Sequence, residues 1–139
     1  AQERRKAVFI IDPLSRTPVY EQIISQLERF VVQGVLHPGD QVPSVRSLSV
    51  QLGINPNTIL KAFSELAARG IISAAPGRGY FICPDAQQVL AKLWHERLRE
   101  LRALCTELAQ AGITWEEILQ SAGQGYAAGA TLLQEEGTK

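Results

Sequence analysis

The sequence of 139 residues contains no methionine and only two cysteines, Cys83 and Cys105. Two distant cysteines are too few for a disulfide scaffold, and they do not form the CxxC pair of a zinc knuckle. No long apolar run is present, so the sequence predicts no membrane-spanning helix, and its first residues do not lead into a signal peptide. These absences predict a cytoplasmic protein with reduced thiols.

Motifs for catalysis and for metal or cofactor binding are also missing. His37 and His95 are isolated, and no HExxH or Cys/His cluster has metal-ligand spacing. There is no GxSxG nucleophile motif, and Gly77-Arg78-Gly79 lacks the Lys-Ser/Thr pair of a phosphate-binding loop. The sequence therefore predicts no catalytic residue, no metal site and no cofactor.

The formal net charge is zero, because 14 Lys and Arg balance 14 Asp and Glu. This balance excludes a histone-like basic binder and an acidic disordered protein. The charge is nevertheless uneven: residues 1–84 hold nine basic and six acidic residues, and residues 85–139 hold five basic and eight acidic ones. Between 41 and 84 a single acid, Glu65, accompanies four bases, Arg46, Lys61, Arg69 and Arg78. We expect this segment to attract a polyanion.

Capping residues and apolar periodicity predict three helices in the first half of the chain. Each begins at an N-cap residue and ends at a glycine: Thr17 to Gly34, Ser44 to Gly53, and Asn55 to Gly70. Proline follows Thr17 and Asn55, at the first helical position where its missing N–H costs nothing. Because so short a turn joins the second and third helices, the pattern predicts a helix-turn-helix.

After Gly70 the spacing of apolar residues changes from the helical period of about 3.6 residues to an alternation of every second residue, which is typical of a β-strand. Residues 71–75 and 80–83 predict short strands joined by the turn Pro76-Gly77-Arg78-Gly79. A hairpin directly after a helix-turn-helix is a wing. The sequence therefore predicts a winged helix-turn-helix domain over residues 10–84.

The C-terminal part predicts further helices. Pro84-Asp85 begins a long helix over 86–111, and a stripe at steps of four and three is typical of a helix–helix interface: Trp94, Leu98, Leu101, Cys105 and Leu108. Thr114 and Glu117 form a capping box for a short final helix that ends near Ala122 or Gly123.

Three segments result from these boundaries. Residues 85–123 are predicted to form a two-helix dimerisation region, and residues 124–139, rich in Gly, Ala, Thr and Glu, a flexible tail. The expected fold class is mainly α with a small β-hairpin (α+β): a winged helix-turn-helix followed by a short C-terminal helical dimerisation region.

The start of the third helix carries the candidate base contacts. In a helix-turn-helix this end of the second helix of the pair enters the major groove. The Asn57 carboxamide can pair with adenine, and the Thr58 hydroxyl and methyl can reach a base, a phosphate or thymine. Capping already explains Asn55, which we expect to be a cap first and a DNA contact second.

Basic residues around that helix are the other candidates. Arg46 is either a solvated arginine that can pair with Asp40 or a contact to guanine or phosphate. Ser44 is a cap with a phosphate contact as a second role, and Lys61 suits a phosphate. Gly77 and Arg78 are either only a tight hairpin tip or a wing tip whose arginine enters the minor groove.

The sequence resembles the GntR family of bacterial transcription regulators. The resemblance covers about residues 10–83 and rests on a series of motifs in unbroken order: Tyr20-x-Gln22-Ile23, Gly34, Pro38-Gly39-Asp40, Pro43-Ser44-Val45-Arg46-x-Leu48, Asn57-Thr58-Ile59, Lys61-Ala62-Phe63, Leu66, Gly70-Ile71-Ile72 and Gly77-Arg78-Gly79-Tyr80-Phe81-Ile82. It implies a winged helix-turn-helix that binds operator DNA as a dimer. It also implies DNA contacts from Arg46, Asn55, Asn57, Thr58, Gly77 and Arg78.

The sequence departs from the common family pattern at Pro56, where many members have an arginine that reads a guanine. A guanine preference at that base is therefore not carried over. The Asn-Pro-Asn-Thr version and the short C-terminal region resemble the YtrA-like subfamily, whose members have two short helices for dimerisation there and often control transporter operons.

The expected function is that of a sequence-specific DNA-binding transcriptional regulator, a dimeric repressor that binds a palindromic operator. Its expected partners are double-stranded operator DNA and a second copy of the chain, with no membrane and an unidentified small-molecule effector left open. One alternative is a winged helix that binds proteins, if Arg46, Asn57 and Arg78 lie on different faces. Another is a fragment of a larger enzyme, since some members of the resembled family fuse this domain to an aminotransferase-like domain that binds pyridoxal phosphate, although the expected frayed end at Lys139 favours a natural terminus.

Overall fold

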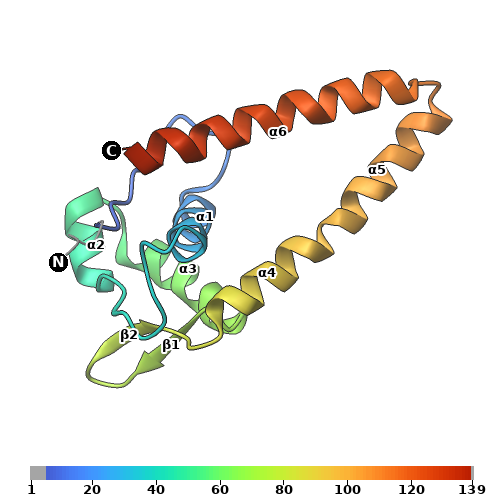
Figure 1. The fold of residues 1–139 in the computed structure, drawn as a ribbon. Helices are drawn as coiled ribbons and strands as arrows, with labels where there is room; N and C mark the ends of the chain where they lie inside the picture. The colour runs from blue at the N-terminus through green and yellow to red at the C-terminus, as the bar shows by residue number, and fades with distance from the viewer. Residues whose placement is uncertain (1–5, 139) are drawn as a thin grey trace. The chain divides into compact units, whose positions relative to one another are not determined.

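The computed structural model describes residues 6–138. Its elements in chain order are α1 (Val19–Val32), α2 (Val45–Leu52), α3 (Pro56–Ala68), β1 (Ile72–Ala75), β2 (Gly79–Ile82), α4 (Ala86–Glu96), α5 (Leu98–Gln110) and α6 (Trp115–Thr138) (Figure 1). The chain divides into two compact units, one up to Trp94 and one from His95 onward. The expected fold class, mainly helical with one small hairpin, is confirmed.

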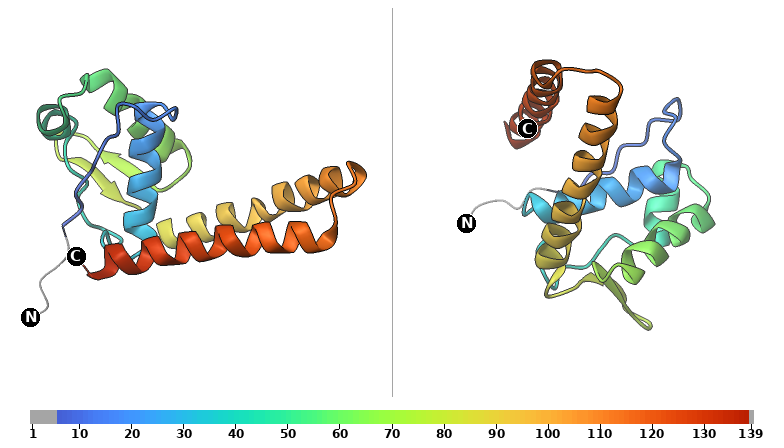
Figure 2. Two further views of the ribbon diagram at one scale, coloured as in Figure 1. Left: turned by 90° about the horizontal axis from the view of Figure 1, so that it is seen from above. Right: turned by 90° about the vertical axis from the view of Figure 1, so that its right-hand side faces the viewer.

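The N-terminal unit is a winged helix-turn-helix. Helix α3 packs against α1, α2 and β1, and the β1–β2 hairpin extends from the helices (Figure 2). The two strands pair antiparallel with Ile72 opposite Ile82 and Ala75 opposite Gly79. The core consists of apolar side chains from all these elements, among them the fully buried Ile23, Leu27, Leu48, Ile59, Phe63, Leu66 and Ile71.

The core of this unit continues beyond the expected boundary at residue 84. Ala86 and Leu90, in the first two turns of α4, are both 0% exposed and belong to the same cluster. Burial of these side chains ties the start of α4 to the winged domain. The unit therefore includes part of the segment that the sequence assigns to dimerisation.

Two glutamines of α1 hold the chain segment that precedes it. Gln26 accepts a hydrogen bond from the Ile10 N–H at 2.8 Å and donates to the Ile10 carbonyl. Gln22, one turn earlier, accepts from the Asp12 N–H at 2.9 Å and donates to the Asp12 carbonyl at 3.0 Å. Each carboxamide thus satisfies both polar groups of one backbone residue, as a neighbouring strand would, while Phe9, directly before Ile10, enters the core.

Two of the three N-caps predicted for α1, α2 and α3 are confirmed. The Ser44 hydroxyl accepts from the Ser47 N–H at 3.0 Å, and the Asn55 side chain accepts from the Asn57 N–H at 2.9 Å, so both predicted N-caps are confirmed. The predicted Thr17 cap is wrong: Pro18 is the N-cap of α1, with no side-chain hydrogen bond there. The Thr17 carbonyl instead accepts a hydrogen bond from the Gln22 side chain at 2.9 Å.

The predicted long helix over 86–111 is two helices, α4 and α5, separated by Arg97. Arg97 has φ −67° and ψ −17°, close to the values of a 3₁₀ turn, and its carbonyl accepts from the Glu100 N–H at 3.0 Å, three residues later. The interruption is therefore a local tightening of the hydrogen-bond pattern. Neither glycine nor proline marks it in the sequence.

The predicted end of the final helix near Ala122 or Gly123 is also wrong, because α6 continues to Thr138. The segment from Gln124 is rich in Ala, Leu, Gln and Glu, which are strong helix formers. Each glycine costs about 1 kcal/mol relative to alanine but does not end a helix by itself. The expected flexible tail over 124–139 is thus helical as far as Thr138, and Lys139 lies outside the described residues.

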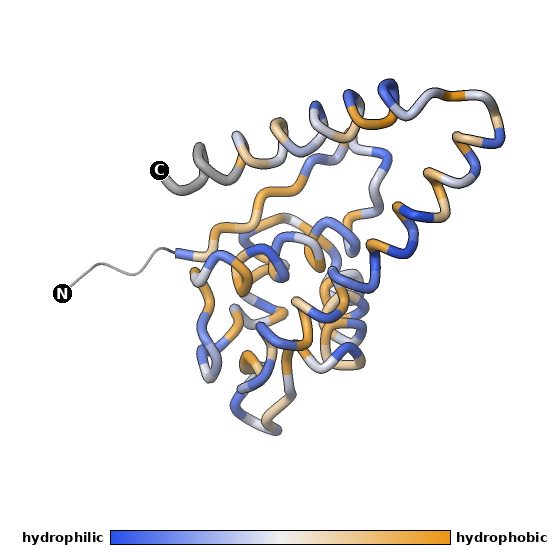
Figure 3. Tube along the Cα trace, turned by 45° about the vertical axis from the view of Figure 1, so that its right-hand side comes forward, coloured by the Kyte–Doolittle hydropathy of each residue, from blue (hydrophilic) through white to orange (hydrophobic). Residues whose placement is uncertain are grey.

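The C-terminal unit contains α5 and α6, joined at Gly112. The capping box that opens α6 is confirmed: the Thr114 hydroxyl accepts from the Glu117 N–H at 3.2 Å, and Glu117 accepts from the Thr114 N–H at 2.9 Å. Apolar residues recur along both helices (Figure 3). Yet no described side chain between residues 95 and 132 is buried. The described part of this unit has no core of its own.

Candidate nucleic-acid interface

The amino end of α2 presents two of the predicted residues. Ser44 caps the helix, and Arg46, in its first turn, is exposed. Within residues 6–138 the Arg46 guanidinium forms no hydrogen bond or ion pair, so the alternative in which it pairs with Asp40 is not observed. The Asp40 carboxylate lies 3.6 Å from His37 Nδ1 and accepts from the His37 N–H at 2.9 Å. Arg46 is therefore available to a partner.

The turn between α2 and α3 is closed by two hydrogen bonds between the same pair of residues. The Ser49 hydroxyl donates to the Ile54 carbonyl at 2.7 Å, and the Ile54 N–H donates to the Ser49 carbonyl at 3.2 Å. Gly53, at φ +65°, supplies the left-handed residue that ends α2. These bonds fix the direction in which α3 leaves the turn.

The amino end of α3 is open to solvent. Asn55, Pro56 and Asn57 are exposed, whereas Thr58 is half-buried. Because Asn55 Oδ1 is occupied by the Asn57 N–H, only the amide NH₂ of Asn55 is left to donate to a partner. The Asn57 carboxamide keeps both its donor and its acceptor, since no described residue bonds to it. That pairing capacity is what recognition of an adenine edge requires.

Helix α3 has a buried face and an exposed face. Ile59, Ala62, Phe63 and Leu66 are all 0% exposed, whereas Asn57, Leu60, Lys61 and Ser64, at helical spacing on the other side, are exposed. Lys61 occupies a defined position, because its Nζ lies 3.8 Å from the centroid of the Tyr20 ring on α1. This cation–π contact orients the ammonium on the α1 side of the exposed face.

One of the four bases between 41 and 84 has a structural role. Arg69 Nη1 lies 2.8 Å from Glu28 Oε1, and Arg69 Nη2 lies 3.6 Å from Glu65 Oε2. Glu28 is 8% exposed, so this pair keeps a nearly buried carboxylate compensated. The same contacts neutralise Glu65, the one acid of the segment. The positive charge available there comes from Arg46, Lys61 and Arg78.

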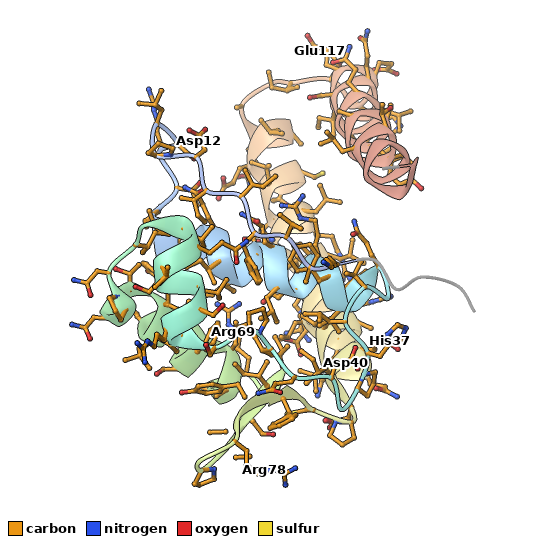
Figure 4. The ribbon with its side chains drawn as sticks, turned by 90° about the vertical axis from the view of Figure 1, so that its left-hand side faces the viewer. Asp12, His37, Asp40, Arg69, Arg78 and Glu117 are labelled. Carbon is orange, nitrogen blue, oxygen red and sulfur yellow. The ribbon has the colours of Figure 1, made fainter. Side chains whose placement is uncertain are left out.

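The hairpin tip carries Arg78 away from the helices (Figure 4). The Arg78 N–H donates to the Ala75 carbonyl at 2.9 Å, and Gly77 between them has φ +74°, the value that the third residue of a type II turn requires. Pro76 supplies the second residue of this turn. The Arg78 guanidinium is exposed and has no hydrogen bond or ion pair to a described residue.

Two further contacts hold the wing. Gln41 Nε2 donates to the Arg78 carbonyl at 2.9 Å, so the tip is fastened to the segment before α2. A Cβ added at Gly79 would lie 3.1 Å from that same nitrogen, which leaves little room for a side chain there. On β2, the Tyr80 ring packs edge-on against Phe63 of α3 with centroids 5.0 Å apart. The wing is thereby joined to α3.

The predicted dimerisation stripe is largely accessible in the single chain. Trp94, Leu98 and Leu101 are 49%, 47% and 48% exposed, and Cys105 and Leu108 are half-buried. Other large apolar side chains of α5 and α6 are exposed as well, namely Leu104, Trp115, Leu119, Tyr126 and Leu132.

Two searches of the described residues were negative. No group of three or more His, Cys, Asp or Glu side chains there is arranged to hold a metal ion. No helix in the described part of the chain is both long and apolar enough to span a membrane.

Sequence patterns had not identified Tyr20, Gln41 or Ser49 as parts of this surface. Tyr20 contacts Lys61 and Gln41 contacts Arg78, and both partners are distant in the chain. Ser49 contacts Ile54 across the turn between α2 and α3. A weak signal exists for Ser49 alone, because serine hydroxyls often bond to nearby backbone groups at turns.

Comparisons with known proteins agree with this geometry. Residues 19–82 match the family model described as bacterial regulatory proteins, gntR family. The HTH-type transcriptional repressor YtrA of Bacillus subtilis (strain 168) is 40% identical over 109 residues, which cover 78% of this chain and 84% of that protein. These two matches confirm the predicted family and its YtrA-like resemblance.

Solved structures show the same fold. A protein described as a transcriptional antiterminator from Listeria monocytogenes EGD-e superposes with a TM-score of 0.65 at 32% identity, covering 86% of this chain and 90% of that one. YtrA from Sulfolobus acidocaldarius, described as a GntR-family transcription factor, superposes with a TM-score of 0.53 at 33% identity, covering 66% of this chain and 97% of that one. With a helix-turn-helix, a wing and relatives of this kind, the chain belongs to the GntR family of DNA-binding transcriptional regulators.

Proposed function

We propose that this regulator is a dimeric repressor that binds an operator with two-fold related half-sites through α2, α3 and the wing. The observation that carries the proposal is the amino end of α3, which is exposed and fixed in direction by the Ser49–Ile54 bonds. The positive end of the helix dipole makes such an end favourable for the polyanionic duplex.

Base recognition is assigned to the first turn of α3. Asn57 pairs with an adenine edge through its free carboxamide, and Thr58 contributes its exposed part to a base or phosphate. Asn55 and Ser44 use their oxygen atoms as cap acceptors, so each offers a phosphate only its remaining donor, the amide NH₂ and the hydroxyl hydrogen.

The cations supply electrostatic attraction and register. Arg46 binds guanine or phosphate from the start of α2, and Lys61 binds phosphate from the α1 side of α3. At the wing, Arg78 enters the minor groove, and Gly77 permits close approach of the backbone. None of these three cations has an acidic partner among the described residues, so their charge is available to the duplex.

Dimerisation is assigned to the C-terminal helices. The described side chains from 95 to 132 include none that is buried, and a helical hairpin without a core gains little stability on its own. Its exposed apolar side chains are typical of a surface that another chain covers. A second copy supplies an identical stripe through Trp94, Leu98, Leu101, Cys105 and Leu108. Two copies then present two recognition helices about 34–36 Å apart, one turn of DNA.

The sign of the regulation is inferred from a relative. The Bacillus subtilis protein that is 40% identical over most of both chains is named a transcriptional repressor. We infer that this chain also represses transcription, acting in the cytoplasm where bacterial operators lie.

The test is selection of bound duplexes from a random DNA pool by the full chain, followed by titration at several salt concentrations. An enriched palindrome is expected, together with an affinity that falls steeply with salt because each phosphate contact releases counterions. A shuffled duplex of the same composition is the control. Absence of an enriched sequence, or affinity independent of salt, would contradict the proposal and favour a winged helix that binds proteins.

A further inference from the structure

Leu60 is a large aliphatic side chain on the exposed face of α3. It is 40% exposed, whereas Ile59 and Leu66 on the same helix are 0% exposed. Its side chain is not needed to fill the core, because α3 already contributes four fully buried residues to it. The helix thus presents an apolar group among polar ones on the surface to which we assign base recognition.

The position of Leu60 on that face is defined by its neighbours. It lies one turn after Asn57 and about 100° around the helix axis from Lys61, which contacts Tyr20 of α1. On its other flank is Phe63, whose ring packs against Tyr80 of the wing. Leu60 therefore occupies the wing side of the exposed face, next to Asn57, and Lys61 occupies the α1 side.

The edges of the bases offer a partner for such a group. In the major groove the C5-methyl of thymine is the apolar feature of the standard base pairs, while the other groups are hydrogen-bond donors and acceptors. A leucine beside an asparagine matches a thymine methyl beside an adenine edge. Burial of both surfaces from water favours the contact.

We propose that Leu60 is a specificity-determining residue that contacts the methyl group of one thymine in each half-site. The proposal rests on the DNA interface proposed above and adds a base preference on the wing side of Asn57. Because the contact is to a methyl group, 5-methylcytosine at the same position would also satisfy it.

The test removes the methyl group and the side chain separately. Thymines of one half-site of the selected operator are replaced one at a time by deoxyuridine, which lacks only the methyl. At one position the wild-type chain is expected to lose affinity about fourfold, the effect of one buried methyl-sized group. Leu60→Ala is expected to bind the unmodified operator more weakly and to be indifferent to uridine at that position. Cytosine and 5-methylcytosine placed there should differ for the wild type and not for Leu60→Ala.

Two further variants serve as controls for Leu60→Ala. Leu60→Met retains an apolar side chain and should retain the sensitivity to uridine. Val32→Ala, at the end of α1 where Val32 is 59% exposed, removes apolar surface outside the interface and should leave the uridine profile of the wild type. An unchanged melting temperature for Leu60→Ala shows that the fold is intact.

The possible failures are distinguishable. If no duplex is enriched, the proposed function fails before Leu60 is tested. If an operator is found but uridine has no effect at any thymine, or its effect is the same in Leu60→Ala as in the wild type, the methyl contact is overturned while DNA binding stands.

Discussion

The ammonium of Lys61 on α3 lies 3.8 Å from the ring centroid of Tyr20 on α1. The Tyr20 hydroxyl donates to Glu21 Oε1 at 3.2 Å, and this hydrogen bond raises the pKa of Tyr20. The phenol therefore stays neutral at physiological pH, and Lys61 interacts with the face of the ring. Tyr20 is thus a positioning residue for a cation that we assign to the DNA backbone.

Replacement of Tyr20 by leucine should weaken operator binding about twofold to fivefold, because an exposed cation–π contact contributes about 0.5–1 kcal/mol. Tyr20→Phe keeps the ring and should bind as the wild type does. Titrations monitored by fluorescence anisotropy would measure both. In a Lys61→Ala background Tyr20→Leu should have no further effect, and an undiminished loss there would contradict the positioning role.

Arg46→Ala should weaken operator binding by about 1–3 kcal/mol, because a guanidinium contact to a base or phosphate is lost. Arg46→Lys keeps the charge but not the two-pronged donor, so it should recover affinity for phosphate and not for guanine. Lys92→Ala, an exposed cation on α4, is the matched control and should change little. Unaltered affinity of Arg46→Ala would remove Arg46 from the interface.

Gln41→Ala should loosen the wing tip by removing the 2.9 Å hydrogen bond to the Arg78 carbonyl. The expected loss of affinity is at most about tenfold, since a neutral hydrogen bond contributes about 0.5–1.5 kcal/mol. If Gln41 acts through Arg78, the loss should disappear in an Arg78→Ala background. Gln88→Ala, an exposed glutamine of α4, serves as the control. Additive losses in the double variant would show that Gln41 acts elsewhere.

Leu101→Asp should shift the protein from dimer to monomer in sedimentation velocity experiments. Leu101 is 48% exposed in the single chain, and a carboxylate inside an apolar interface would be left without compensation. Arg99→Asp changes charge on the opposite side of the same helix and should leave the dimer intact. A dimer that persists in Leu101→Asp would place the interface on other residues.

The amino end of α6 should lose stability in acid. Hydrogen bonds from the Thr114 backbone and hydroxyl lower the pKa of Glu117. A carboxyl with a lowered folded-state pKa stabilises the fold above its unfolded pKa, and this contribution disappears as the pH falls through the folded value. Circular dichroism should be recorded as the pH is lowered from about 7 to about 3, an interval that includes the ordinary pKa values of carboxyl groups. The loss of helical signal should be smaller in Glu117→Gln. Equal losses in both proteins would contradict this cause.

Local signals in the sequence predicted much of the N-terminal unit. The caps at Ser44 and Asn55 are formed between residues two or three positions apart, so side-chain type and spacing are enough to predict them. The change of period after Gly70 likewise marks the hairpin. Thr17 is the exception, because Pro18 takes the cap position and the Thr17 carbonyl accepts a hydrogen bond from Gln22.

Other features depend on information that a local pattern does not contain. The break between α4 and α5 at Arg97 contains no glycine or proline that would predict it. Conversely, α6 continues through Gly123, Gly125 and Gly129, although glycines commonly predict the end of a helix. Gln41 contacts Arg78, 37 positions later in the chain, and Tyr20 contacts Lys61, 41 positions later. Only the folded chain reveals such contacts.

The buried and exposed faces of α3 share no residue. Ile59, Ala62, Phe63 and Leu66 keep the helix in place, while Asn57, Leu60, Lys61 and Ser64 contribute little to that packing. Under the interface proposed above, exchange of the outer set would redirect the regulator to a new promoter while the buried packing of α3 stays the same.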